Sequence, residues 1–273
     1  YIGKNVTVDQ EKAIEYFKMA IEKGNPEAMN NYGKILCEVD KNDNEAIKYF
    51  KKAADLGNGS AMTNYACCLE LGKGTEIDKE EALKYYKMAI EKGDTNAMNR
   101  YAYMLRTGDI VKIDKEEAIK YYKIGIEKGD ALSMSKYGFM LENGEGVPVD
   151  KEQALKFYKM SADNGCSEGM INYGMLLKEN GQYEESIKYL LMAIRQGNST
   201  AMYNLGSILE NDGGDKNEAL KYYKMAADNG HSDALNNYAN LLSKMDGDIN
   251  EVIKYYKMAI EKGNTTAMCN YSW

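Results

Sequence analysis

Apolar residues recur along this chain at the spacing of amphipathic α-helices. In the segment Ala82–Ile90, apolar side chains fall at offsets of 0, 3, 4, 7 and 8 from the first alanine, which is one face of a helix. In the segment Ala28–Leu36, they fall at offsets of 0, 1, 4, 5 and 8, which also lie on one face. The two kinds of segment alternate from end to end of the sequence. We call the Ala28–Leu36 type helix A and the Ala82–Ile90 type helix B.

A glycine closes each helix B, and its recurrence gives the period of the chain. The spacings between successive glycines are 33, 36, 36, 36, 32, 33 and 33 residues, which is enough for two helices and a turn. These glycines are Gly24, Gly57, Gly93, Gly129, Gly165, Gly197, Gly230 and Gly263. Glycine takes the left-handed conformation after a helix without steric cost, so each one predicts a helix end. Capping boxes, in which an Asp precedes a Glu by three residues, predict where helix B begins, at Asp78/Glu81, Asp114/Glu117, Asp215/Glu218 and Asp248/Glu251.

Neither helix type buries its apolar face alone, whereas a stack of antiparallel pairs does. Offset 5 of helix A is small in seven copies, which favours close approach of a neighbouring helix: Gly33, Ala66, Ala102, Gly138, Gly174, Gly206 and Ala239. The sequence therefore predicts an all-α fold, a right-handed α-solenoid of stacked antiparallel helix pairs with repeats of 32–36 residues. About seven complete pairs (25–263) and two partial repeats (1–24 and 264–273) are expected to form a single domain over 1–273. Repeat length changes near Gly165, and we expect the curvature to change there.

The sequence resembles Sel1-like repeats, which are relatives of the tetratricopeptide repeat. The resemblance rests on the pattern A-x-x-x-[LY]-G-x-x-[LY], a turn such as Glu145–Asp150, and then K-x-A-x-x-[YF]-[YF]-x-x-[AS]. It covers essentially the whole chain. It implies adaptor roles in signalling or in protein quality control, with helix A lining the inner, concave surface. The resemblance does not identify a partner.

Composition narrows the classes of partner and compartment. The net charge is −7 and the pI is about 5.1, which argues against nucleic acid or an anionic membrane because phosphate binding needs a basic surface. No apolar run approaches the roughly 20 residues of a membrane span, so no membrane insertion is expected. Five cysteines without a C-x-x-C motif indicate reduced thiols and an intracellular, cytoplasmic protein.

The two ends of the sequence lie inside the repeat pattern. The chain has no initiating methionine and starts on what resembles the tail of a helix A, Tyr1–Asn5. It stops at Trp273, inside another helix A. We interpret the chain as part of a longer protein whose targeting sequence is missing. The apolar faces expected at both ends favour self-association.

The residue at offset 3 of helix A is a candidate for ligand binding. Asparagine occupies this offset in six of eight copies, although asparagine is a mediocre helix former: Asn31, Asn64, Asn172, Asn204, Asn237 and Asn270, with Arg100 and Lys136 in the other two. Each amide offers two donors and an acceptor, so a ladder of asparagines on the concave face could hold a peptide backbone. The alternative is a structural role, in which each asparagine bonds to the backbone of the next repeat.

Variable positions surround this ladder, and those in the third to fifth repeats are the least uniform. They place two cations beside apolar and aromatic groups: Arg100, Tyr103, Lys136, Phe139, Ile171 and Met175. An exposed aromatic side chain requires an explanation, and a partner supplies one. A peptide with an acidic group and an apolar anchor is the complementary ligand. We expect the residues that contribute most of the binding free energy to lie in these repeats.

Other conspicuous residues have structural explanations. His231 is the only histidine and follows Gly230, where a surface turn is expected. The tyrosines of K-Y-Y-K are expected on the buried face of helix B and the lysines on the opposite face. Core packing therefore explains this motif without a site that stacks nucleotide bases. The methionines at offset 1 of helix A are expected to fill the core. The lysines and glutamates of helix B are expected to form a solvated outer surface.

The leading hypothesis is a non-catalytic scaffold that binds a peptide or partner protein on the concave helix A surface. The sequence contains no glycine-rich phosphate loop, metal-ligand cluster or Ser/His/Asp set, so no enzyme activity, cofactor or metal is predicted. The alternative is a structural spacer or oligomerisation arm that associates through its ends. A remote alternative is a hydrolase of the cysteine-rich Sel1-like type, whose cysteine pattern this chain lacks.

Overall fold

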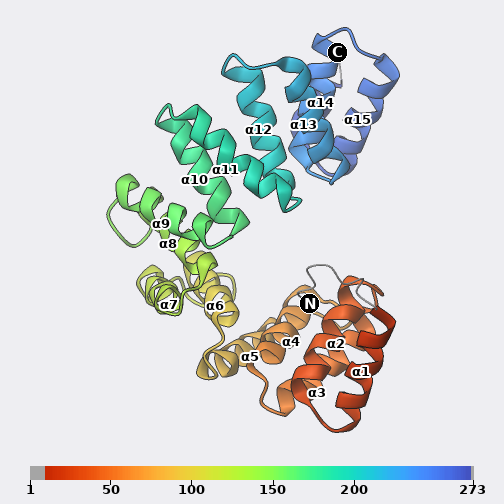
Figure 1. Cartoon of the computed structure of the whole chain (residues 1–273), viewed down its shortest axis with the longest axis vertical. Coiled ribbons are helices and arrows are strands. Elements are labelled where there is room, and N and C mark those ends of the chain that lie inside the picture. Colours follow the sequence, from red (N-terminus) through yellow and green to blue (C-terminus); the bar gives the residue numbers. More distant parts are fainter. Residues whose placement is uncertain (1–9, 272–273) are drawn as a thin grey trace. The chain divides into compact units, whose positions relative to one another are not determined.

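The computed structural model describes residues 10–271, and every regular element in that range is an α-helix. Helices of type B are α1 (Gln10–Glu22), α3 (Asp43–Asp55), α5 (Lys79–Glu91), α7 (Lys115–Glu127), α9 (Lys151–Asp163), α11 (Tyr183–Arg195), α13 (Lys216–Asp228) and α15 (Ile249–Glu261). Helices of type A are α2 (Pro26–Glu38), α4 (Gly59–Leu71), α6 (Thr95–Thr107), α8 (Ala131–Asn143), α10 (Ser167–Glu179), α12 (Ser199–Asn211), α14 (Ser232–Lys244) and α16 (Thr265–Asn270). The predicted alternation of two helix types is confirmed (Figure 1). The predicted helix tail at Tyr1–Asn5 and the position of Trp273 lie outside the described residues.

The chain divides into two compact units, 1–130 and 131–273. In the first unit, α2 packs on α3 and α4 packs on α5, and successive helices A also touch each other. In the second unit, α8 packs on α9, α10 on α11, α12 on α13 and α14 on α15. Each unit is therefore a stack of helix pairs. The extension of one continuous solenoid over 1–273, and the change of curvature near Gly165, stay predictions.

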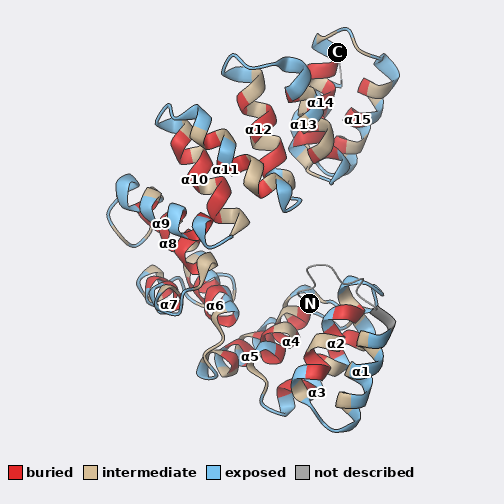
Figure 2. Cartoon of the chain, viewed as in Figure 1, coloured by how far each residue is buried: buried red, intermediate tan, exposed pale blue. Residues whose placement is uncertain are grey.

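Buried residues follow the interfaces between paired helices (Figure 2). A tyrosine at offset 4 of helix A meets an aromatic ring of helix B in the same repeat, edge to face, with ring centroids 4.6–5.2 Å apart in six repeats. The predicted core role of the helix B tyrosines is confirmed, since Tyr86, Tyr122, Tyr158 and Tyr223 are fully buried. The offset-1 methionines are buried in α2, α4, α6, α8, α10 and α12, whereas Met268 in the short α16 is exposed.

Glycine fulfils two separate roles in the repeat. The glycine after each helix B has φ between 78° and 87°, which confirms the predicted left-handed helix end. Inside helix A, a Cβ atom on Gly138 would lie 2.9 Å from the ring of Tyr158, and one on Gly206 would lie 2.8 Å from the ring of Tyr223. The predicted close approach is therefore made by an aromatic residue of helix B in the same repeat.

The capping prediction is correct for the aspartates and incomplete for the glutamates. Asp78 and Asp114 each accept a hydrogen bond from the backbone N–H three residues later, at 2.9 and 2.8 Å. Asp215 and Asp248 instead accept from the residue two positions later. The Glu251 carboxylate accepts hydrogen bonds from Lys224 at 2.7 Å and Tyr238 at 3.0 Å, so it serves contacts between helices. The Glu251 carboxylate therefore bonds to other helices and not to the beginning of its own helix, as a capping box would require.

Candidate binding surface on helix A

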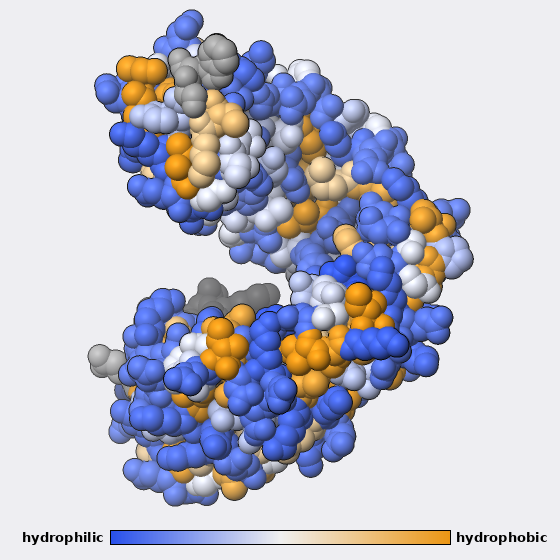
Figure 3. All heavy atoms as spheres, turned by 180° about the vertical axis from the view of Figure 1, so that it is seen from behind, coloured by the Kyte–Doolittle hydropathy of each residue, from blue (hydrophilic) through white to orange (hydrophobic). Residues whose placement is uncertain are grey.

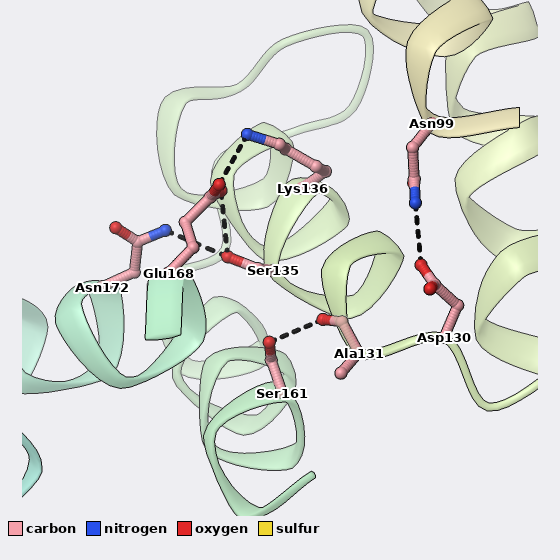
Figure 4. A network of polar contacts seen from close by, with 8 residues as sticks. All are labelled: Asn99, Asp130, Ala131, Ser135, Lys136, Ser161, Glu168 and Asn172. Carbon is pink, nitrogen blue, oxygen red and sulfur yellow. Dashed lines mark hydrogen bonds and ion pairs between the residues drawn. The ribbon is translucent and has the colours of Figure 1, made fainter. Parts of the chain in front are cut away.

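Polar side chains connect each helix A to the next along the first unit. Asn64 Nδ2 donates to Asn30 Oδ1 at 2.7 Å, and both side chains are at least partly buried. Thr63 Oγ1 donates to Asp94 at 2.9 Å, where Asp94 is also the N-cap of α6. Asn99 Nδ2 donates to Asp130 at 2.8 Å (Figure 4). These bonds fix the register of neighbouring repeats.

The second unit repeats this arrangement with a salt bridge added. Lys136 Nζ lies 2.8 Å from Glu168 Oε2, and Ser135 Oγ donates to the other carboxylate oxygen at 3.2 Å. Asn172 Nδ2 donates to Ser135 Oγ at 3.1 Å (Figure 4). Further along, Asn270 Nδ2 donates to Asn236 Oδ1 at 3.0 Å. A buried polar residue at offset 2 of one helix A thus pairs with the beginning of the next helix A.

The offset-3 asparagines therefore have a structural role in at least three repeats. Asn64, Asn172 and Asn270 bond to a side chain of the preceding repeat, and not to the backbone of the next one as the structural alternative specified. Each of these amides retains a second N–H for other partners. Asn31 and Asn204 are half-buried, and Asn237 accepts from Asn236 at 3.2 Å.

The remaining candidate residues differ in how far they are available to a partner. Arg100 and Tyr103 are exposed, and Phe139, Lys136 and Met175 are half-buried. Ile171 is the exception, because only 8% of it is exposed. It occupies offset 2, the position that faces the next repeat, so burial counts against its direct contact with a partner. The sequence pattern predicted Ile171 among the variable positions around the asparagine ladder, whereas the structure places offset 2 at the repeat interface.

The first unit presents a cationic and aromatic group of residues on α6. The Tyr103 ring is 42% exposed, and the Arg106 guanidinium lies 5.3 Å from its centroid. Partial desolvation would lower the pKa of the Arg100 guanidinium, but nearby side chains, the Glu70 carboxylate among them, raise it overall. Arg100 is therefore held as a cation beside an exposed aromatic ring.

In three repeats, a tyrosine of helix B donates a hydrogen bond to a glutamate of helix A. Sequence reasoning missed this contact. Tyr86 Oη donates to Glu70 at 2.6 Å and lies 3.1 Å from Cys67 Sγ. Tyr158 bonds in the same way to Glu142 at 2.6 Å, and Tyr223 to Glu210 at 2.9 Å. Burial raises the pKa of these three tyrosines, so they remain neutral donors. A glutamate at offset 9 of helix A could have predicted this contact, because the three repeats that form the bond have one there: Glu70, Glu142 and Glu210.

His231 is the N-cap of α14, and it does more than occupy a surface turn. Its Nδ1 accepts from the Ala234 N–H at 3.3 Å, and its ring stacks on Tyr203 with centroids 4.7 Å apart and an angle of 12°. Burial lowers the pKa of His231, while Asp233 opposes this effect. Because Nδ1 must be unprotonated to accept, the cap exists only in neutral histidine.

Acidification is therefore expected to weaken the fold at this cap. A histidine whose folded pKa lies below its unfolded value contributes stability above pH ~6.5, and this stability is lost as the pH falls below that value. His231→Asn copies the caps at Asn58, Asn198 and Asn264. This variant should keep the cap and lose the pH dependence of its stability. The measurement is thermal unfolding of both proteins between pH 7.5 and 5. Parallel pH profiles for the two proteins would contradict the assignment.

Two findings limit the chemistry of the described residues. Within 10–271, no group of three or more histidine, cysteine, aspartate or glutamate side chains is arranged to hold a metal ion. In the same range, no helix is long and apolar enough to cross a membrane. The arrangement on helix A is one of hydrogen-bonding amides, charges and aromatic rings, which suits recognition of a polypeptide.

Stacked antiparallel helix pairs with a polar seam between successive helices A define an α-helical repeat protein. The Sel1 repeat matches eight consecutive stretches: 1–25, 26–58, 59–94, 95–130, 131–166, 167–198, 199–231 and 232–264. The chain therefore belongs to the Sel1 repeat family, as its sequence pattern predicted. Sel1 repeat proteins generally mediate protein–protein interactions and are typically non-catalytic scaffolds.

Solved structures of Sel1 repeat proteins are similar over most of the chain. A Sel1 repeat protein from Oxalobacter formigenes shares 29% identity with a TM-score of 0.66, covering 79% of this chain and all but 1% of its own. The protective antigen c5321 of uropathogenic Escherichia coli shares 28% identity with a TM-score of 0.58, covering 98% of this chain. This chain spans 61% of that antigen's length. Human IFIT1, solved with PPP-AAAA, shares 16% identity with a TM-score of 0.63, which shows similarity of fold alone. No curated protein matches the chain significantly.

Proposed function

We propose that this chain is a non-catalytic scaffold that binds a protein segment on the exposed surface of its helices A. The observation that carries the proposal is the group Arg100, Tyr103 and Arg106 on α6, where an exposed aromatic ring stands beside cations. In a Sel1 repeat protein, such a group suits a partner with a carboxylate and an apolar anchor. In the second unit, Lys136, Phe139 and Met175 offer a similar combination, with Lys136 already paired to Glu168.

The surface itself favours a segment of polypeptide over a small molecule. Its polar groups recur once per repeat along helices A, so a ligand must be long to meet several of them. The asparagines that bond to the preceding repeat keep one free N–H each for an extended backbone. A compact ligand that contacts a single repeat would meet only one set of these polar groups.

Removing the cations is expected to weaken partner binding without unfolding the protein. Arg100→Ala and Lys136→Ala should each reduce affinity for a captured partner roughly tenfold, or about 1.4 kcal/mol, and the double variant should bind more weakly than either. Lys156→Ala on the exposed side of α9 is the matched control, because Lys156 pairs with Glu152 of the same helix at 2.8 Å. Affinity is measured by surface plasmon resonance after capture from lysate. Equal loss in all variants, or loss in none, would contradict the assignment.

A structural role through the end of the stack is the second candidate function. A groove of 690 Å³ lies between α14, α15 and α16, and its lining includes Val252, Tyr256 and the exposed Tyr271. Apolar side chains share the lining with Asn240, Ser243 and Asn270, so the groove offers both packing surface and hydrogen bonds to another helix. Light scattering distinguishes the two roles. Molecular mass that rises with protein concentration supports association, and a constant monomer mass rejects it.

A further inference from the structure

The beginning of α10 differs from the beginnings of other helices A. Six of them start with a side chain that accepts a hydrogen bond from the backbone N–H three residues later: Asn25, Asn58, Asp94, Asn198, His231 and Asn264. The corresponding residue of α10 is Cys166, and its side chain makes no such bond. The first turn also contains Gly169, and glycine loses more conformational freedom in a helix than any other residue. This turn therefore opens more readily than a capped one.

The missing cap coincides with a different contact between neighbouring helices A. Asp94 is the N-cap of α6 and also accepts a hydrogen bond from Thr63 of α4 at 2.9 Å. Asp130, directly before α8, accepts from Asn99 of α6 at 2.8 Å. At α10, the carboxylate that accepts from the preceding helix A belongs to Glu168, which lies inside the first turn. Glu168 thus replaces the aspartate in the contact between repeats, but it does not cap the helix.

Glu168 also contacts the cation that the proposed function assigns to a partner. Its Oε2 lies 2.8 Å from Lys136 Nζ, and its Oε1 accepts from Ser135 Oγ at 3.2 Å (Figure 4). The Lys136 and Glu168 side chains are 31% and 38% exposed, so water reaches both. An ion pair exposed to this degree contributes little to stability. Glu168 therefore offers Lys136 the same chemical group, a carboxylate, that the proposed function assigns to the partner.

The composition of the surface makes this lysine important for affinity. Figure 3 shows that hydrophilic residues dominate the face it displays and that apolar residues form small groups among them. On the helices A of the second unit, Phe139 and Met175 are half-buried, so they offer a partner limited apolar contact. Part of the affinity must then come from charge, and Lys136 is already paired.

We propose that Glu168 is a built-in competitor of the partner's carboxylate. In the free chain, Glu168 pairs with Lys136. When a partner binds, the uncapped first turn of α10 releases Glu168 to water, and the partner's carboxylate takes its place on Lys136. This inference rests on the proposed function, in which a carboxylate of the partner binds this cation. It makes the surface selective, because a segment without a carboxylate leaves the Lys136–Glu168 pair intact.

The test uses peptides selected from a random displayed library on the whole chain. Peptides that bind Lys136 are recognised by weaker binding to Lys136→Ala. They are expected to bind Glu168→Gln about fivefold more tightly, which is the effect of releasing an ion pair worth up to about 1 kcal/mol. Cys166→Asn copies the cap at Asn58 and should hold the first turn of α10 in place. This variant is expected to bind the same peptides several-fold more weakly and to melt at a higher temperature.

Two controls separate competition from a general change of charge. Glu152→Gln removes the same charge from α9, where the carboxylate pairs with Lys156 of its own helix at 2.8 Å. It should leave the affinity unchanged. In the Lys136→Ala background, Glu168→Gln should also have no effect, because the competition acts only through this lysine.

The outcomes distinguish this inference from the proposed function. If Lys136→Ala weakens binding and Glu168→Gln leaves it unchanged, the competition is rejected and the proposed function stands. If Glu168→Gln binds more tightly and Cys166→Asn binds with unchanged affinity, the role of the uncapped turn is wrong. Peptides that bind Lys136→Ala as well as the original chain would reject Lys136 as a binding residue and the competition with it. A selection without enrichment would count against both.

Discussion

Replacing Gly169 with alanine is expected to lower the free energy of unfolding by about 1–3 kcal/mol, the usual range for overpacking a core. Gly169 begins the buried face of α10, where six other helices A have alanine. A Cβ atom here would collide with the hydroxyl of Ser161 and lie 2.9 Å from the backbone nitrogen of Ala162. The Ser161 hydroxyl is fixed in place, because it donates to the Ala131 carbonyl at 2.6 Å (Figure 4).

The cause of this loss is the pairing of Gly169 with Ser161, and a double-mutant cycle isolates it. In six other repeats, the same two positions are both alanine: Ala20 with Ala28, Ala53 with Ala61, Ala89 with Ala97, Ala193 with Ala201, Ala226 with Ala234 and Ala259 with Ala267. Adding Ser161→Ala to Gly169→Ala should therefore restore much of the stability. A coupling energy of about 0.5–3 kcal/mol is expected for such neighbours. Urea denaturation of the four proteins measures it, and additive effects of the two substitutions would contradict the packing explanation.

Replacing Tyr158 with phenylalanine is expected to cost about 1.5–3 kcal/mol, the range for a hydrogen bond to a charged group. The fully buried hydroxyl donates to the Glu142 carboxylate at 2.6 Å, and this bond joins α9 to α8. Glu142 is half-buried and regains water when the bond is lost, so the lower end of that range is expected. The ring still fills its site, and the loss reports on the hydrogen bond alone.

Tyr222→Phe is the matched control for this prediction. Tyr222 occupies the neighbouring aromatic position of a helix B and is only half-buried, so removal of its hydroxyl should change stability by less than about 0.5 kcal/mol. Thermal unfolding of both variants makes the comparison. An equal effect of the two substitutions would mean that the Tyr158–Glu142 bond adds nothing specific.

The fold was predictable because one pattern is stated eight times. Offsets of 3 and 4 residues, the glycine after helix B and the aspartate before it are all local signals, and each is confirmed where the structure describes it. Contacts between repeats were less accessible. The same asparagine appears at offset 3 whether it binds a ligand or the preceding repeat. The periodicity of the sequence therefore could not distinguish these two roles.

The limits of the pattern are clearest at Ile171 and Glu251. Ile171 varies in type from its equivalents, which suggested a recognition surface, yet the repeat interface accepts isoleucine, threonine, serine or asparagine at that position and buries each of them. Glu251 has the sequence of a capping box, yet Lys224 and Tyr238 from other helices bind its carboxylate. In both cases the deciding contact comes from a neighbouring helix, and a single repeat does not contain it.

Site-specific photo-cross-linking can show whether a partner binds on the helix A surface. A benzophenone amino acid would replace Tyr103 on α6 or Asn204 on α12 in one set of proteins, and the outer residues Lys87 and Lys156 of helices B in the other. Partner cross-links are expected from the helix A positions, and few from the two lysine positions. Cross-links that form mainly from Lys87 and Lys156 would contradict binding on the helix A surface.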